Sequence, residues 1–301
     1  MTSFLNALPG AISQGLIWGV MAIGVYITYK ILDIADLTVD GSICTGAAVC
    51  AVMILSGCPV WLSMLCAALS GVLAGLCTGL LHIALGIPAL LSGILTQLML
   101  WSVNLKILGQ ANRALPARGY AVLLSSMQIP HALLVLGIGV ALLICLLYLF
   151  FGTELGCAIR ATGANAAMSR AQGINTSLMK LTGLALSNGL VALCGAFLCQ
   201  YQGYSDINMG RGAVIIGLAA VIIGETLLSK IAKNFAVRLL GVVLGAVIYY
   251  IVYQVVIFIG FDPDLLKMFS ALVVVVFLGV PYVKERISQS YAVHKGEKKD
   301  A

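Results

Sequence analysis

Residues 41–105 read GSICTGAAVCAVMILSGCPVWLSMLCAALSGVLAGLCTGLLHIALGIPALLSGILTQLMLWSVNL and contain no Asp, Glu, Lys or Arg. A charged side chain at mid-bilayer costs about 2.5–3.5 kcal/mol even on a lenient insertion scale, so such a stretch is typical of membrane spans. One crossing takes about 20 residues, and this stretch is too long for one. Gly57-Cys58-Pro59 and Gly86-Ile87-Pro88 divide it, because proline lacks a backbone donor and disfavours helix in the residue before it. The stretch predicts three consecutive spanning helices.

The rest of the chain has the same character. Of its 301 residues, 61% are hydrophobic and only 9% are charged, whereas soluble domains carry about 25% charged residues. This composition excludes a water-soluble globular protein, a disordered chain and a coiled coil. The apolar runs are continuous, not short and alternating, so we expect helices and not a barrel of strands. The predicted fold is an all-α polytopic membrane protein.

We expect about nine transmembrane helices, within a range of eight to ten. Their approximate bounds are 11–32, 38–57, 60–85, 88–107, 130–152, 177–201, 208–228, 236–260 and 265–283. No basic region precedes the first apolar run, which argues against a cleaved signal peptide. These spans predict a transmembrane domain over residues 1–285 and a polar cytoplasmic tail over residues 286–301.

The distribution of basic residues orients the predicted spans, because cytoplasmic loops are enriched in Lys and Arg. With the C-terminus in the cytoplasm, nine spans place the N-terminus outside, and 12 of the 17 basic residues lie on the inner side. These are Lys30, Arg160, Arg170, Lys180, Lys230, Lys233, Arg238, Lys284, Arg286, Lys295, Lys298 and Lys299. The net charge of +6 therefore needs no nucleic acid to explain it, and we expect the lipid bilayer to be the surface that the basic tail contacts.

The chain offers few groups for catalysis or metal binding. Its nine cysteines lie almost entirely within the predicted spans, and no two have C-x-x-C spacing. It has no H-E-x-x-H motif, and its three histidines are isolated from one another. We therefore expect no catalytic residue, no metal, no disulfide and no cofactor.

Two segments resemble each other. Residues 36–46 read DLTVDGSICTG, and residues 206–217 read DINMGRGAVIIG, which align once a single-residue slip is allowed. Each follows a long apolar span and opens another, and five predicted spans separate them, so the two copies would have opposite orientations. Short or interrupted spans in matching positions of two halves indicate a transport site. The pattern predicts inverted repeats over about residues 10–152 and 177–283, and a chance likeness between two glycine-rich helix starts is the alternative.

Polar side chains in and beside the spans are candidates for a solute path. Asp36 and Asp40 lie where we expect the first helix to break, and either could cap a helix N-terminus or line the path. Asp206 and Asn208 lie in the second segment. Asn188 is near the middle of its span, where an amide either hydrogen-bonds a neighbouring helix or contacts the solute. We take these five residues as path candidates.

A polar stretch joins the two halves on the predicted inner side. Residues 153–175 read TELGCAIRATGANAAMSRAQGIN. Between Gly163 and Gly173 the sequence is rich in alanine, a strong helix former, and it ends in a glycine stop. This predicts a short helix parallel to the membrane that docks into a groove of a cytoplasmic partner. An ordinary amphipathic loop is the alternative.

The same stretch resembles the coupling loop of ABC-importer permeases of the branched-chain amino acid and ribose type. The matching residues are Thr153, Leu155, Gly156, Arg160, Ala161, Gly163, Asn165, Ala166, Ala167, Gly173 and Ile174. Residues 36–46 are similar to that family's signature after the first span, although Ala35-Asp36-Leu37 stands where many members have Asn-Phe-Ala. The resemblance covers about residues 10–285, and within the family the chain is most similar to tryptophan/tyrosine permeases.

The resemblance implies a non-catalytic subunit of a bacterial importer in the plasma membrane. Such a permease pairs with a second permease, two cytoplasmic ABC ATPases and an external substrate-binding protein. A chain of this size would form one half of the pore, so we expect a homodimer, with a heterodimer as the alternative. The chain has no G-x-x-x-x-G-K-[ST] phosphate loop, so its energy must come from another chain. The contact with the ATPase would come from the coupling loop, residues 153–176, through Arg160, Gly163, Asn165, Ala166, Arg170 and Gly173. The implied solute is an aromatic or branched-chain amino acid, with a sugar or nucleoside as the alternative.

An ion-coupled secondary transporter is the nearest rival, because inverted repeats and broken helices occur there as well. Such a carrier needs a buried acid to hold the coupling charge. Asp36, Asp40 and Glu225 are the acids that the predicted spans offer.

Overall fold

The computed structural model describes residues 2–116, 120, 122–228 and 234–259, together with Met268, Leu272, Val275 and Gly279. Its helices are α1 (Thr2–Tyr26), the π-helical turn η1 (Ile27–Ile31), α2 (Val39–Leu55), α3 (Val60–Ile83), α4 (Ala89–Leu108), α5 (Ile129–Gly152), α6 (Glu154–Ala164), α7 (Ala166–Ala171), α8 (Thr176–Gln202), α9 (Ala213–Leu228) and α10 (Phe235–Phe258). Two short strands, β1 (Asn112–Ala114) and β2 (Tyr204–Asp206), pair antiparallel.

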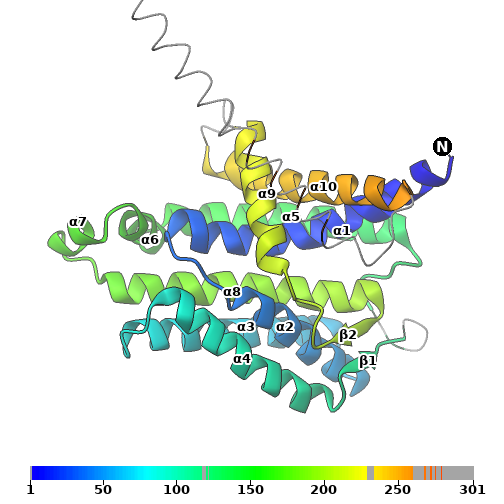
Figure 1. The fold of residues 1–301 in the computed structure, drawn as a ribbon, viewed down its shortest axis with the longest axis horizontal. Helices are drawn as coiled ribbons and strands as arrows, with labels where there is room; N and C mark the ends of the chain where they lie inside the picture. Colours follow the sequence, from blue (N-terminus) through cyan, green and yellow to red (C-terminus); the bar gives the residue numbers. More distant parts are fainter. Residues whose placement is uncertain are drawn as a thin grey trace, which may run out of the picture.

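The long helices lie side by side along the longest axis of the molecule (Figure 1). At one end, α7 lies beyond the other helices, and α6 lies between α7 and the end of α1. The β1–β2 pair and the N-terminus lie toward the opposite end. In this view α9 crosses the direction of the long helices. The two ends of the molecule are therefore built differently.

Six described helical segments are long and apolar enough to cross a membrane, namely Ala7–Ile31, α3, α4, α5, α8 and α10. α2 and α9 have only 17 and 16 residues, and at 1.5 Å per residue they extend about 24–26 Å against a hydrocarbon core of about 30 Å. The all-α multi-pass fold is confirmed, whereas nine full spans are not. The predicted spans 38–57 and 208–228 correspond to shorter helices, and 265–283 lies outside the described residues except for four positions.

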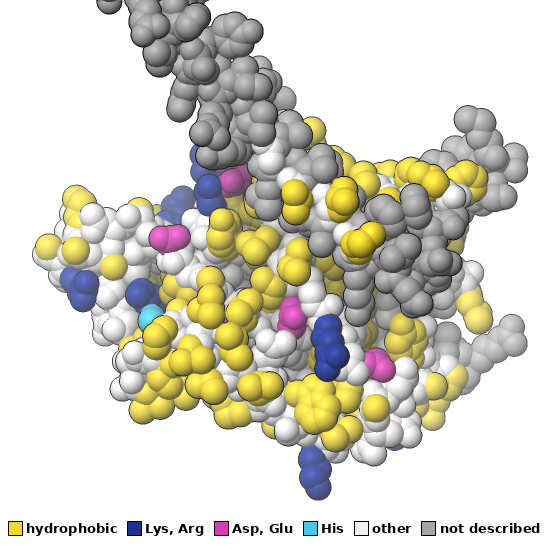
Figure 2. Space-filling model, in the orientation of Figure 1, with side chains coloured by type: hydrophobic (Ala, Val, Ile, Leu, Met, Phe, Trp, Pro, Cys, Tyr) yellow, Lys and Arg dark blue, Asp and Glu magenta, His cyan; other side chains and the backbone are white. Residues whose placement is uncertain are grey.

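α1 and α8 form the centre of the described structure. Their apolar windows are 78% and 72% buried, against 22% for α4 and for α5. The outer helices expose large apolar side chains such as Leu69, Leu98 and Leu142, and Figure 2 shows hydrophobic side chains spread over the visible face. Apolar surface on this scale suits a lipid environment and not water.

Small residues bring α3 and α8 into close contact. A Cβ atom at Gly71 would collide with the carbonyl oxygen of Asn188, and one at Gly75 would collide with that of Leu184. Apolar surface alone does not drive helix association in lipid, so close backbone packing and interhelical hydrogen bonds take over that role. These contacts hold the middle of α8, including Asn188, firmly against α3.

Candidate functional site

The first interruption of the helices lies between η1 and α2. The chain leaves the π-helical turn at Leu32, Asp33 has a φ of 54°, and residues 33–37 are without regular structure. A break is thus observed where the sequence predicts one. Asp36 is buried within it, with its Oδ1 accepting the backbone N–H of Thr38 at 2.9 Å.

Asn188 fastens this break to α8. Its Nδ2 donates to Asp36 Oδ2 at 2.7 Å and to the carbonyl of Leu184 at 3.0 Å, and its Oδ1 accepts from Ser42 Oγ at 2.6 Å. Asn188 is fully buried, and an unpaired polar group at such a site would be costly. In this conformation, Asn188 joins the break to both α2 and α8.

The second interruption lies between α8 and α9. α8 ends at Gln202 with Gly203 as its C-cap, and β2 follows. Asp206 Oδ1 accepts the backbone N–H of Asn208 at 2.6 Å. Asp206 also lies opposite Asn112 in the β1–β2 ladder. Gly212, directly before α9, has a φ of 87°, a conformation in which glycine carries no steric penalty. The Asp206 side chain thus shapes a turn at the end of the molecule opposite α6 and α7.

Asp40 connects the two interruptions. Although it lies in the first turn of α2, its Oδ2 accepts the N–H of Gly212 at 3.0 Å and its Oδ1 accepts that of Val214 at 3.1 Å. The first amides of a helix have no partner within the helix and carry partial positive charge, so a carboxylate stabilises them. A side chain of the first segment therefore caps the helix that follows the second.

A cavity of about 120 Å³ opens beside this connection. It is lined by Asp40, Gly41, Cys44, Gln97, Leu98, Trp101, Asn104, Ile207 and Arg211. Asn104 is buried, and its Oδ1 has no hydrogen-bond partner among the described residues. The path candidate Asp40 lines the cavity, whereas Asp36 and Asn188 do not. The path candidates predicted from the sequence did not include Gln97, Asn104 and Arg211. Gln97 and Asn104 could have been found, because they are polar residues inside a predicted apolar span.

The polar stretch after α5 forms two helices in place of one. Asn165 is extended, with φ −158° and ψ 100°, and it separates α6 from α7. Its side chain accepts the N–H of Met168 at 2.9 Å, which makes it the N-cap of α7. The predicted short helix between Gly163 and Gly173 is observed as α7, which is shorter than predicted, and α6, to which Gly163 belongs, was not predicted. Gly173 ends the turn after α7 with a φ of 82°.

α6 packs directly on the end of the first helix. A Cβ at Gly163 would collide with the carbonyl oxygen of Ile31, so only glycine permits this approach. Arg160 Nη2 donates to the carbonyl of Phe151 at 3.0 Å. On α7, Arg170 is exposed and its Nε donates to the carbonyl of Ala166 at 3.2 Å. The segment thus presents an outward surface on α7 and a tight inner contact on α6.

Several apolar crossing helices, two interruptions that meet at Asp40, and a projecting helical segment define a multi-pass membrane protein of the transport class. The chain belongs to the family described as the permease component of the branched-chain amino acid transport system, a family of ABC-type permeases, which it matches over residues 8–278. The resemblance seen in the sequence is therefore confirmed.

Individual relatives cover most of the chain. It is 38% identical over 274 residues to the tyrosine transport system permease protein of Clostridioides difficile, with 91% of each chain covered. It is 34% identical over 282 residues to an uncharacterized protein of Rickettsia prowazekii, covering 93% of this chain and 99% of the relative. It is 27% identical over 252 residues to the galactofuranose transporter permease protein of Escherichia coli, covering 81% and 70%. No solved structure matches the chain.

Proposed function

We propose that this chain is the transmembrane permease subunit of a bacterial ABC importer and forms the path of a small solute. The contact between Gly163 and the Ile31 carbonyl carries the proposal. It ties a projecting segment, suited to a cytoplasmic partner, to the helix that leads into the first interruption. The chain lacks a phosphate loop for ATP, so a separate ATPase would supply the energy.

The contacts support one route by which movement of the ATPases would reach the solute path. Closure of the ATPases would press on α6 and α7 through Arg160, Gly163, Asn165, Ala166, Arg170 and Gly173. Because Gly163 abuts Ile31, α6 would carry η1 and the break with it. The carboxylate of Asp40 would pass the movement to the start of α9. A two-state rocking of this kind is how alternating access works in transporters with discontinuous helices.

The order of helices supports inverted repeats over residues 10–152 and 177–283, joined by the coupling loop 153–176. In each half a long helix is followed by an interruption, a short helix of 17 or 16 residues, and a helix of 24 residues. We place the N-terminus outside and the tail 286–301 in the cytoplasm. Two such chains would form a homodimer with two ATPases and an external substrate-binding protein.

The favoured solute is an amino acid of the aromatic or branched-chain type. The relative from Clostridioides difficile, named for tyrosine, supports this class. The 120 Å³ cavity is lined by Arg211, Asp40 and Asn104, and Asn104 Oδ1 has no hydrogen-bond partner among the described residues. A cation and oxygen acceptors are what a zwitterion needs. We assign Asp40, Asp206 and Asn208 to the outer part of the path, and Asp36 and Asn188 to its support.

A sugar is the second candidate, because the galactofuranose permease is also a relative and the cavity amides suit hydroxyl groups. Competition separates the two classes. In cells carrying the complete importer, excess unlabelled tyrosine should suppress uptake of labelled tyrosine, and excess galactofuranose should not. The reverse pattern with labelled galactofuranose would assign the chain to sugar transport.

A further inference from the structure

α9 is attached at both ends to the chain around the first interruption. At its start, the amides of Gly212 and Val214 bond to the carboxylate of Asp40, which follows the interruption. Near its end, Glu225 Oε2 lies 3.1 Å from Nζ of Lys30, which precedes the interruption in η1. α9 therefore spans the interruption as a strap, with one attachment on each side of it.

Glu225 contributes nothing favourable to α9 as a helix. It is the only charged residue of α9 and lies in the last turn, where the free carbonyls carry partial negative charge and disfavour an acid. Lys30 is likewise the only charged residue of α1 and η1. Charges in and beside apolar spans are costly and pair with one another. The ion pair thus explains why α9 carries an acid at this end, whereas local helix stability does not.

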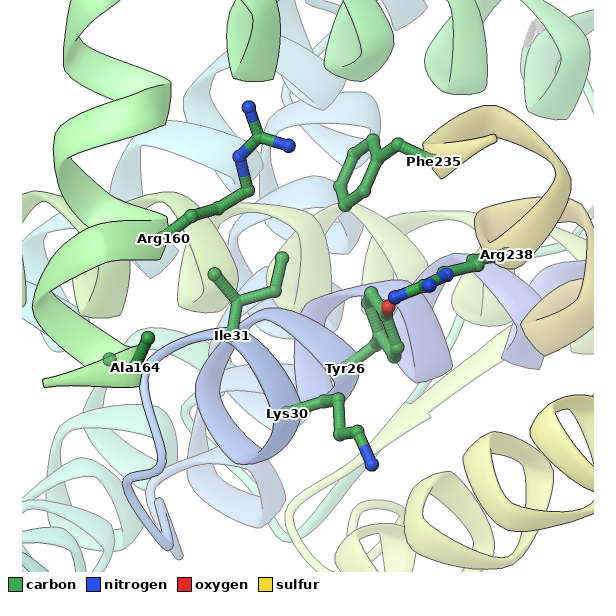
Figure 3. A pocket seen from close by; sticks show the side chains of 8 residues that line it. Tyr26, Lys30, Ile31, Arg160, Ala164, Phe235 and Arg238 are labelled. Carbon is green, nitrogen blue, oxygen red and sulfur yellow. The ribbon is translucent and has the colours of Figure 1, made fainter. Parts of the chain in front are cut away.

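η1 borders an open space. A cavity of about 340 Å³ lies where η1, α6 and the start of α10 meet, and Tyr26 and Ile31 line it (Figure 3). In Figure 3 the Lys30 side chain points away from Arg160 of α6. Protein interiors contain few voids larger than a water molecule, so η1 has room to shift toward this cavity. Its single π-helical turn is a rare form that is frequent at functional sites.

We propose that the ion pair between Lys30 and Glu225 is a latch that holds η1 against α9 and restrains the first interruption. With the latch closed, both ends of residues 33–37 are tied to one helix. With the latch open, only the attachment through Asp40 remains, and η1 can shift. The two side chains are 51% and 33% exposed, and ion pairs with such access to water open at little cost. In the transport cycle, a role that rests on the proposed function, pressure on α6 would open the latch.

The backbone amides of residues 32–38 report on the latch. Leu32 N–H donates to the Ile27 carbonyl at 3.0 Å, and Ile34 N–H donates to the Thr28 carbonyl at 2.9 Å. A hydrogen-bonded amide exchanges with solvent deuterium only when its bond opens. Exchange over this segment therefore measures how often the interruption moves relative to η1.

Hydrogen–deuterium exchange of the purified full-length protein, read by mass spectrometry, tests the latch. Lys30→Gln and Glu225→Gln should each speed exchange over residues 32–38 about two- to fivefold, the range expected when a partly exposed ion pair is lost. Lys106→Gln is the matched control. Lys106 also lies in the last turn of its helix, is exposed and makes no ion pair with a described residue, so this variant should exchange like the wild type.

Charge exchange separates the latch from a general loss of structure. Lys30→Glu/Glu225→Lys restores opposite charges and should return exchange toward the wild-type rate, whereas Lys30→Glu alone places two acids together and should exceed Lys30→Gln. High salt screens an exposed pair, so it should speed exchange over residues 32–38 in the wild type but not in Glu225→Gln.

Two results would overturn the proposal. One is equal exchange over residues 32–38 in the wild type, Lys30→Gln and Glu225→Gln. The other is faster exchange in these variants that extends over α8, because the pair would then support the whole fold and not the interruption. These readouts do not involve transport, so their failure leaves the proposed function standing.

Discussion

The carboxylate of Asp40 and the backbone amide of Gly212 are 3.0 Å apart, although 172 positions separate the two residues in the chain. Val214 donates to the same carboxylate at 3.1 Å. The helix α9 thus begins on a side chain that belongs to α2. If α2 moved while the start of α9 stayed in place, the Asp40 carboxylate would lose its hydrogen bonds to the first amides of α9. The two helices are therefore expected to move together.

Removing the cap should weaken both the fold and uptake. Asp40→Ala leaves two helix-terminal amides without an acceptor and should lower the free energy of unfolding by about 1–2 kcal/mol. Asp40→Asn keeps one acceptor oxygen and should fall between Asp40→Ala and the wild type. Thermal unfolding in detergent and solute uptake in cells measure the two effects. Asp33→Asn changes an exposed acid nearby and serves as the control; an equal effect at both positions would refute the capping role.

The two glycines of the coupling segment should differ in their response to substitution. Gly163→Val places a side chain against the carbonyl of Ile31 and should push α6 away from η1, so ATP hydrolysis continues while uptake falls about tenfold or more. Gly173 faces open space and needs only a positive φ, which asparagine tolerates, so Gly173→Asn should stay close to the wild type. The ratio of solute imported to ATP hydrolysed is the measurement. Normal coupling in Gly163→Val would remove α6 from the mechanism.

The pair Asp36 and Asn188 should behave as a unit. Asn188→Leu strands the buried carboxylate of Asp36 without its amide donor and should cost about 1–3 kcal/mol in stability. The exchange Asp36→Asn/Asn188→Asp restores an amide opposite a carboxylate and should recover much of that loss. Thermal unfolding of the single variants and of the exchanged protein measures the coupling. An exchanged protein no better than Asn188→Leu would show that the two residues act separately.

The inverted arrangement predicts opposite accessibility of the two interruptions. Asp33 and Asn208 are both exposed, so single cysteines introduced there should be reachable by a membrane-impermeant thiol reagent. In intact spheroplasts, we expect labelling of Asn208→Cys and protection of Asp33→Cys until the membrane is opened. The unsubstituted protein gives the background from the nine natural cysteines. Labelling of both positions from the same side would disprove the inversion.

The membrane class and the break near Asp36 could be predicted from the sequence, because charge depletion and glycine positions are local signals. The bond between Asp40 and α9 could not, since it joins residues that only tertiary packing brings together. Likewise, alanine content predicts helix between Gly163 and Gly173, but the Asn165 side chain caps a new helix there and divides it. Helix propensity does not predict whether an Asn side chain will hydrogen-bond a nearby backbone N–H and so start a new helix.

Arg211 shows the same limit for the site. In the sequence it is one basic residue beside a glycine-rich turn, and the orientation argument treats it as an outer charge. The structure places it in the cavity with Asp40 and Asn104, residues from two different helices. Convergence of this kind depends on how α2, α4 and the turn before α9 meet, and no spacing along the chain encodes it.

The source of energy separates the proposed importer from an ion-coupled carrier, for which the buried acid Asp36 is the feature in favour. The direct measurement is tyrosine uptake into proteoliposomes that contain this chain, its ATPase and its binding protein. We expect uptake that requires Mg-ATP, ceases when the ATPase is omitted, and persists when proton and sodium gradients are collapsed. Uptake by this chain alone, driven by an imposed ion gradient, would contradict the account.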